Sequence, residues 1–125
     1  MNQLALNETG RIILAMGNDA IVRGGLEAGL GYFSTYPGTP ASEIGEGYLA
    51  LSKEFPHIHA EFSVNEHVAA HGAQGASWAG VRSMVAMKHV GMNVAAEVRE
   101  VGGQYGWCND HVRHNPTSPV YPGRS

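Results

Sequence analysis

Short apolar runs alternate along this chain with longer segments in which apolar residues recur every three or four positions. The short runs are rich in β-branched and aromatic residues and predict strands at residues 11–17, 31–37, 57–64 and 81–88. The longer segments predict helices at residues 18–30, 41–55 and 65–80. Strands separated by helices of this length are typical of a parallel sheet with crossover helices, so the pattern predicts an α/β fold.

One predicted helix has an unusual apolar face. In the segment 65–80 that face is made almost entirely of small residues, which are Val68, Ala69, Gly72, Ala73 and Ala76. Small side chains allow a helix to lie very close to its neighbour. The face fits close packing inside one domain, and it also fits a seam between subunits.

The stretch YPGTP, residues 36–40, predicts a tight connection between a strand and a helix. Pro37 and Gly38 fit the two central positions of a type II turn, in which Gly38 adopts a positive φ. Thr39 then fits a helix N-cap and Pro40 the first helical position, and Asn18 is a similar N-cap candidate for the preceding helix. Ligands of α/β proteins bind at such carboxyl ends of parallel strands, although Thr39 also fits a purely capping role.

Two further strand ends carry ionisable residues. Glu66 follows the predicted strand 57–64 at the start of a helix, and Lys88 and His89 follow the strand 81–88. If the three strands are neighbours, Thr39, Glu66 and the Lys88–His89 pair converge on one crevice. Taken separately, Glu66 also fits an ordinary first-turn glutamate, and Lys88 and His89 fit a solvated loop.

Composition excludes several classes of function. The chain has 125 residues, enough for one domain, and eight Lys and Arg against eleven Asp and Glu give a net charge of −3. Without a basic run we expect no nucleic-acid partner, and without a long apolar segment no membrane span. The single cysteine, Cys108, cannot form an internal disulfide, which fits a cytoplasmic location. Neither nucleotide-binding glycine motif, G-x-G-x-x-G or G-x-x-x-x-G-K-[ST], is present.

Three motifs in this order resemble a known family: Y-P-G-T-P at 36–40, S-x-N-E at 63–66 and K-H-V-G-x-N at 88–93. From about residue 11 to residue 97 the chain is similar to the N-terminal pyrimidine-binding domain of thiamine-diphosphate-dependent 2-oxoacid:ferredoxin oxidoreductases. The likeness is strongest to the α subunits of the indolepyruvate branch. The resemblance therefore implies part of an oxidoreductase that decarboxylates a 2-oxoacid.

The resemblance also implies roles for individual residues. Glu66 corresponds to the glutamate that pairs with N1′ of the cofactor's aminopyrimidine ring and so promotes proton loss from C2 of its thiazolium. The resemblance implies further cofactor contacts in the turn at residues 36–40 and at the end of the last predicted strand. These residues are Tyr36, Pro37, Gly38, Thr39, Pro40, Lys88 and His89. The resemblance implies Mg²⁺ held by another domain and iron–sulfur clusters in further domains or a partner. It also implies a β subunit and electron transfer to ferredoxin.

The likeness ends after Glu97. The segment 98–125 lacks a strand–helix pattern and contains three of the six prolines of the chain. We therefore expect a partial pyrimidine-binding domain at residues 1–97 and a divergent, poorly ordered tail at residues 98–125. On this reading the chain is a truncated or frame-altered piece of an α subunit, or a small protein with its own tail, and is inactive alone. A non-catalytic fragment that folds only against a partner is a compatible interpretation.

The histidines suggest an alternative function, a small metal-binding protein. His57 and His59 fall on one side of a predicted strand, and His67 and His71 are spaced i, i+4 on a predicted helix. Two imidazoles at that spacing can share a zinc ion, and Glu61 is a possible further ligand. The order E-H-V-A-A-H departs from the H-E-x-x-H order of zinc proteases.

Overall fold

A computed structural model describes residues 3–98 of the chain. The expected poorly ordered tail lies outside the described residues except for Val98, and the expected boundary near residue 97 stays a prediction. The elements follow one another as η1 (Gln3–Ala5), α1 (Gly17–Glu27), β1 (Tyr32–Thr35), α2 (Ser42–Ser52), β2 (His59–Phe62), α3 (Glu66–Trp78), β3 (Ser83–Ala86) and α4 (Gly91–Val94).

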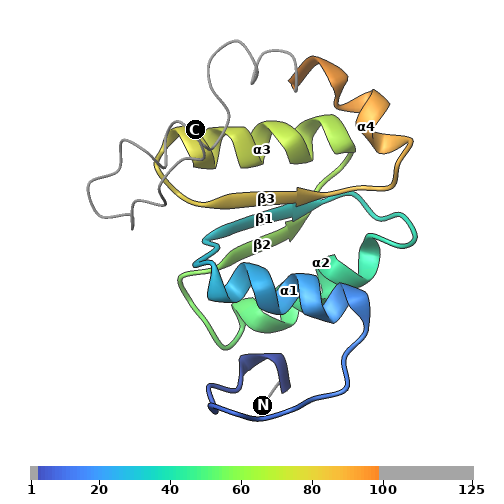
Figure 1. The fold of residues 1–125 in the computed structure, drawn as a ribbon. Coiled ribbons are helices and arrows are strands. Elements are labelled where there is room, and N and C mark those ends of the chain that lie inside the picture. Colours follow the sequence, from blue (N-terminus) through green and yellow to red (C-terminus); the bar gives the residue numbers. More distant parts are fainter. Residues whose placement is uncertain (1–2, 99–125) are drawn as a thin grey trace, which may run out of the picture.

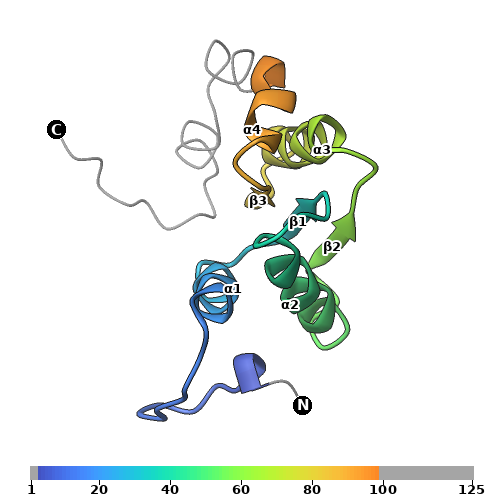
Figure 2. The same cartoon turned by 90° about the vertical axis from the view of Figure 1, so that its right-hand side faces the viewer.

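The described strands form a parallel sheet with the order β2-β1-β3. Helices α1 and α2 cover one face of this sheet, and α3 and α4 lie on the other (Figures 1 and 2). The α/β fold that the sequence predicts is therefore confirmed. Because β2 and β3 both run parallel to β1, the carboxyl ends of all three strands lie at the same edge of the sheet.

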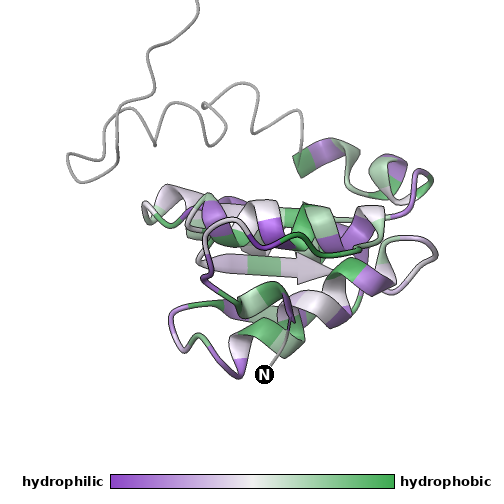
Figure 3. Ribbon diagram, turned by 60° about the horizontal axis from the view of Figure 1, so that its bottom comes forward, coloured by the Kyte–Doolittle hydropathy of each residue, from purple (hydrophilic) through white to green (hydrophobic). Residues whose placement is uncertain are grey.

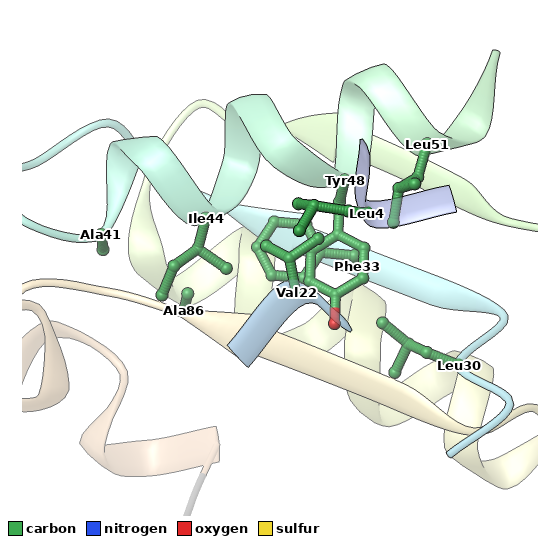
Figure 4. Close-up of a cluster of buried hydrophobic side chains, with 9 residues drawn as sticks. All are labelled: Leu4, Val22, Leu30, Phe33, Ala41, Ile44, Tyr48, Leu51 and Ala86. Atoms are coloured by element: carbon green, nitrogen blue, oxygen red, sulfur yellow. The ribbon is translucent and has the colours of Figure 1, made fainter. Parts of the chain in front are cut away.

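The main core lies between the sheet and the helices α1 and α2 (Figure 4). Phe33 of β1 and Tyr48 of α2 are fully buried, and their rings stack with centroids 4.4 Å apart. Burial also raises the pKa of the Tyr48 hydroxyl to about 12, because the phenolate form would lose its hydration. Ile44, Tyr48 and Leu51, which are three or four positions apart in the sequence, lie on the buried face of α2.

The opposite layer packs more small side chains. Ala69 and Ala73 of α3 are buried, as the small-residue face predicts, whereas Val68 of that predicted face is exposed. Gly72 lies so close to the sheet that a Cβ atom there would be 2.3 Å from the Tyr32 hydroxyl. Close packing within the domain thus accounts for part of this face. Hydrophobic and hydrophilic residues are mixed along the helices of both layers (Figure 3).

The predicted strand at residues 11–17 is wrong. Residues 11–16 form neither strand nor helix, and Ile12 and Leu14 are fully exposed while Ile13 packs against the main core. A run of consecutive apolar residues fits a strand buried on both faces. Such a run forms a strand only where a neighbouring strand pairs with it, and the local sequence does not show whether that neighbour exists. This segment has no strand partner among residues 3–98.

The first helix also differs from its prediction. Its N-cap is Met16, not Asn18, and the Asp19 carboxylate accepts a hydrogen bond of 3.1 Å from the Met16 N–H. Val22 is buried in the main core, whereas Ile21, one of the apolar residues that predicts the helix, is half exposed. The Ile21 side chain therefore lies outside the main core.

Helix α1 contains two adjacent glycines in opposite surroundings, which gives a test of the core. A Cβ atom at Gly25 would lie 1.8 Å from the Tyr48 hydroxyl oxygen, whereas one at Gly24 would meet nothing within 4 Å. We expect Gly25→Ala to lower the free energy of unfolding by about 1–3 kcal/mol through overpacking. Gly24→Ala should raise it by about 0.4–1 kcal/mol, because alanine loses less backbone entropy in a helix.

Urea denaturation followed by circular dichroism measures both variants. Adding Tyr48→Phe to Gly25→Ala removes the oxygen that clashes and should recover part of the loss, as a double-mutant cycle detects. Equal stabilities of the two alanine variants would contradict the packing of α1 on Tyr48.

Candidate functional site

The carboxyl ends of the three strands are held together around Thr35, the last residue of β1. The Thr35 hydroxyl donates a hydrogen bond of 2.7 Å to the Ala86 carbonyl at the end of β3. The Thr35 carbonyl accepts one of 2.7 Å from the Ser63 N–H, just after β2. The loops that follow these strands therefore start from one place, as the sequence predicts if the strands are neighbours.

The loop after β1 contains the five predicted cofactor contacts at residues 36–40. The Thr39–Pro40 peptide bond is cis, and the Ala41 N–H donates to the Gly38 carbonyl across it at 2.7 Å. The predicted turn is wrong in detail, since Gly38 does not have a positive φ. Because this turn continues through Pro40, helix α2 begins only at Ser42, with Ala41 at the N-cap. Thr39 is therefore not the N-cap and Pro40 is not the first helical residue.

Ser42 and Asn18 hold this turn in place, and sequence reasoning assigned neither of them that role. The Gly38 N–H donates to the Ser42 hydroxyl at 2.9 Å. The Asn18 amide donates to the Pro40 carbonyl at 3.1 Å and also to the Glu43 carboxylate. Asn18 thus links the N-terminal ends of α1 and α2. Its position at the start of a helical segment predicts an N-cap, because an asparagine side chain there can bond to the backbone of its own helix. In the structure it bonds to Pro40 and Glu43 instead.

Glu66 is the first residue of α3, next to the N-cap residue Asn65, whose side chain accepts a hydrogen bond of 2.8 Å from the Val68 N–H. A carboxylate at a helix N-terminus is stabilised by the helix dipole. The side chain of Glu66 is half buried and lies against Gly91 of α4. A Cβ atom at Gly91 would be 2.7 Å from its Cγ and 2.8 Å from its Oε1, so only glycine leaves room for this carboxyl group.

The segment after β3 contacts both other loops, through Lys88 and Gly91. A Cβ atom at Gly38 would be 3.4 Å from the Lys88 Cβ, which places the stem of the lysine against the turn after β1. The Lys88 carbonyl accepts a hydrogen bond of 2.8 Å from the Gly91 N–H, next to Glu66. Both Lys88 and His89 are exposed. Contacts therefore run from the turn through Lys88 and Gly91 to the Glu66 carboxyl group.

An apolar cavity of about 470 Å³ lies beside this cluster, against β3. Of the predicted cofactor contacts only Pro40 lines it, together with residues of α1, α2, α3, β3 and α4. Ala70 in its wall is one helical turn after Glu66, and Met92 directly follows Gly91. The carboxyl group and the cavity are therefore neighbours but separate features.

The histidines do not form the metal site of the alternative hypothesis. Within residues 3–98 no group of three or more histidine, cysteine, aspartate or glutamate side chains is close enough to hold a metal ion. The His67 and His71 rings pack on each other with centroids 4.4 Å apart, and the His57 ring packs against Phe55. His59 instead lies 3.2 Å from the Glu61 carboxylate.

Glu61 has its own partners on the face of the sheet covered by α3. The Tyr32 hydroxyl donates a hydrogen bond of 2.7 Å to the carboxylate. This bond is the main reason why the pKa of Glu61 lies below its usual value, while burial raises the pKa of Tyr32.

In the described part of the chain, no helix is long and apolar enough to cross a membrane.

Several known proteins are similar to this chain. Residues 23–98, more than half of the chain, match the family described as pyruvate flavodoxin/ferredoxin oxidoreductase, thiamine diP-binding. The indolepyruvate oxidoreductase subunit IorA of Pyrococcus horikoshii is 48% identical over 91 residues, 73% of this chain and 14% of that subunit. The corresponding subunit of Archaeoglobus fulgidus is 44% identical over 100 residues, 78% of this chain and 16% of the subunit.

The likeness extends to a related enzyme. The 2-oxoglutarate synthase subunit KorA of Archaeoglobus fulgidus is 36% identical over 84 residues, which are 67% of this chain and 24% of that subunit. The chain thus spans less than a quarter of the length of each of these three relatives. The matched region contains β1, β2, β3 and the loops that meet at Glu66. The chain therefore belongs to the thiamine-diphosphate-binding domain family of the pyruvate flavodoxin/ferredoxin oxidoreductases.

Proposed function

We propose that this chain supplies the part of a 2-oxoacid:ferredoxin oxidoreductase that activates the aminopyrimidine ring of thiamine diphosphate. The observation that carries the proposal is the half-buried Glu66 carboxyl group, held against Gly91 where the loops after three parallel strands meet. A carboxyl group in such a place can exchange a proton with a ring nitrogen that bulk water does not reach.

The described residues fit one half of the cofactor. Glu66 offers a carboxyl group to a ring nitrogen, and the space over Gly91 leaves that group free of a competing side chain. The diphosphate and its Mg²⁺ require a set of oxygen ligands, and residues 3–98 provide no acidic or histidine cluster of that kind. We therefore assign the metal and the diphosphate to another domain or subunit.

In this proposal each loop has a separate task. Glu66 holds and moves the proton at N1′ of the aminopyrimidine ring. The turn Tyr36–Pro37–Gly38–Thr39–Pro40, fixed by Asn18 and Ser42, forms a rigid wall for the ring. Lys88 and His89 lie exposed on the next loop, where a cation or an imidazole can bind the carboxylate of the substrate. Thiamine diphosphate, when bound, supplies the nucleophilic carbon that attacks the keto group of a 2-oxoacid.

The relatives suggest the substrate and the partners. Two of them are named as indolepyruvate oxidoreductase subunits and one as a 2-oxoglutarate synthase subunit. The higher identity to the first two supports an aryl 2-oxoacid such as indolepyruvate. Oxidation of the decarboxylated substrate requires an electron acceptor, for which we propose ferredoxin, reached through iron–sulfur clusters on other domains or on a β subunit. A cytoplasmic location remains part of this proposal.

The isolated chain is expected to bind thiamine diphosphate only weakly and to show no oxidoreductase activity. The Glu66 side meets one ring of the cofactor, whereas the charged diphosphate finds no metal site among the described residues. Titration calorimetry with thiamine diphosphate and Mg²⁺ measures the affinity. Micromolar binding by the chain alone would contradict the division of the site between two domains.

Replacing Glu66 by glutamine is expected to keep the fold but to remove proton exchange with the ring. The amide has nearly the same shape as the carboxyl group, yet it cannot take up or release a proton at neutral pH. Loss of such an acid–base group lowers a rate by about 10²–10⁴-fold. NMR can follow proton exchange at C2 of the bound cofactor in a complex reconstituted with the remaining domains of an IorA relative. Unchanged exchange would reduce Glu66 to an ordinary first-turn residue.

Gly91→Ala tests whether the carboxyl group must be held in position. The added Cβ atom would lie 2.7–3.0 Å from three atoms of the Glu66 side chain and would displace it. A displacement near 1 Å can cost about 10²-fold in rate, so C2 exchange should slow strongly. Gly75→Ala, in helix α3, is the matched control because its Cβ atom would meet nothing within 4 Å. Equal exchange rates in the two variants would show that Gly91 does not position Glu66.

A further inference from the structure

The turn after β1 contains a peptide group that is bonded at both ends, the one between Pro40 and Ala41. Its carbonyl accepts a hydrogen bond of 3.1 Å from the Asn18 amide. Its N–H donates one of 2.7 Å to the Gly38 carbonyl. The bond to Gly38 closes the turn on itself, whereas the bond from Asn18 ties the turn to helix α1. Bonds at the two ends of a peptide group strengthen each other by polarisation, so loss of one weakens the other.

The Asn18 side chain can present only its NH₂ group to this turn. Besides the Pro40 carbonyl it faces the Glu43 carboxylate, in the first turn of α2. Both groups are hydrogen-bond acceptors, and an asparagine amide has two N–H hydrogens with which to meet them. Glu43 therefore fixes the direction of the amide, and the amide fixes the Pro40 carbonyl.

The surroundings of Asn18 make these bonds stronger than bonds in water. The residue is half buried and, like Pro40, lines the apolar cavity beside β3. A hydrogen bond next to apolar surface is electrostatically strengthened, and its loss leaves a polar group without a partner. Helix α1 also packs against α2 (Figure 2), so it gives the side chain a firm support.

The turn stands beside the loop that supports Glu66. Its Gly38 lies against the stem of Lys88, and the Lys88 carbonyl accepts a hydrogen bond from the Gly91 N–H. Gly91 is the residue against which the Glu66 carboxyl group lies. In the proposed function the turn forms a wall for the aminopyrimidine ring, so the position of the turn sets the distance between that ring and Glu66.

We propose that Asn18 is a positioning residue of this site. Its amide, oriented by Glu43, holds the Pro40 carbonyl and so sets where the turn stands relative to Glu66. The expected effect on proton exchange at the cofactor rests on the proposed function, whereas the effect on the turn can be measured in the chain alone. A residue of the first helix thereby controls the geometry at the ends of β1 and β2.

Three variants of the full 125-residue chain test the proposal. Asn18→Asp keeps the shape of the side chain but removes its donor and places a negative charge beside Glu43. Adding Glu43→Gln supplies an amide that can donate to the new carboxylate, which restores the link between α1 and α2. Adding Glu46→Gln instead is the matched control. It changes the net charge equally, and Glu46 is an exposed residue of the same helix that makes no hydrogen bond to Asn18.

Hydrogen exchange followed by NMR reports on the turn without any cofactor. In Asn18→Asp the Ala41 N–H should exchange about tenfold faster, as expected for one lost hydrogen bond, and it should stay fast in both double variants. The Ser63 N–H, which makes a bond of 2.7 Å after β2, should change much less. In urea denaturation the double variant with Glu43→Gln should be more stable than the one with Glu46→Gln, because only the former restores the link between the helices.

The effect on the site is measured in the complex reconstituted with the remaining domains of an IorA relative, at saturating thiamine diphosphate. Proton exchange at C2 should be about tenfold slower in Asn18→Asp combined with Glu43→Gln than in the parent, because the ring is no longer held at its distance from Glu66. A merely structural role of Asn18 predicts no such loss in a variant whose stability is restored.

Two results would overturn the proposal directly, namely unchanged exchange of the Ala41 N–H in Asn18→Asp, or its recovery on adding Glu43→Gln. Parental C2 exchange in that double variant would also overturn it where Glu66→Gln slows the same reaction. If Glu66→Gln leaves C2 exchange unchanged, the proposed function fails, and the exchange of the Ala41 N–H still decides whether Asn18 holds the turn.

Discussion

The architecture of this chain depends on one buried residue, Thr35. Through its hydroxyl and its carbonyl it bonds to the ends of both neighbouring strands, and so fixes the level at which all three strands stop. A buried polar group without partners would destabilise the fold, which makes these bonds a strong constraint on register. Gly45 of α2 adds to it, because a Cβ atom there would lie 2.8 Å from the Thr35 methyl carbon. The loops carrying Gly38, Glu66 and Lys88 can meet only because their strands end together.

Much of this arrangement could be predicted from the sequence, for reasons that are local. The positions of three strands and of their helices follow from alternation and spacing, although the strands predicted at residues 31–37, 57–64 and 81–88 are each only four residues long. The shared edge follows from parallel strands that are neighbours. The strand predicted at residues 11–17 is absent, since an apolar run indicates burial but does not show which strand it pairs with. The turn at residues 36–40 failed differently. Proline and glycine predict a turn, but several turn types accept these two residues. The contacts of Asn18 and Ser42 with the turn depend on tertiary structure and cannot be predicted from the local sequence.

The candidate site shows the same division. Glu66 could be proposed from the sequence because a carboxylate after a strand and at a helix start is a recognisable pattern, and because its motif resembles that of a family. Gly91 was not singled out, although it belongs to one of those motifs, since a glycine reveals its purpose only when its neighbours are placed in space. Its role as free space for the Glu66 carboxyl group appears from the distance between two loops. Sequence therefore indicates which groups can react, and tertiary structure indicates what must stay away from them.

The exposed apolar segment before α1 has a consequence for how the chain behaves in solution. Ile12, Leu14 and Met16 are exposed and lie next to the ion pair of Arg11 and Glu8. Short β-prone segments without internal charge are the units that assemble into cross-β aggregates, and flanking charges act as gatekeepers that slow this assembly. Arg11 and Glu8, whose exposed ion pair contributes little to folding, are the charges placed to oppose self-association through this segment. High ionic strength, which screens their charge, favours self-association over the dispersed state.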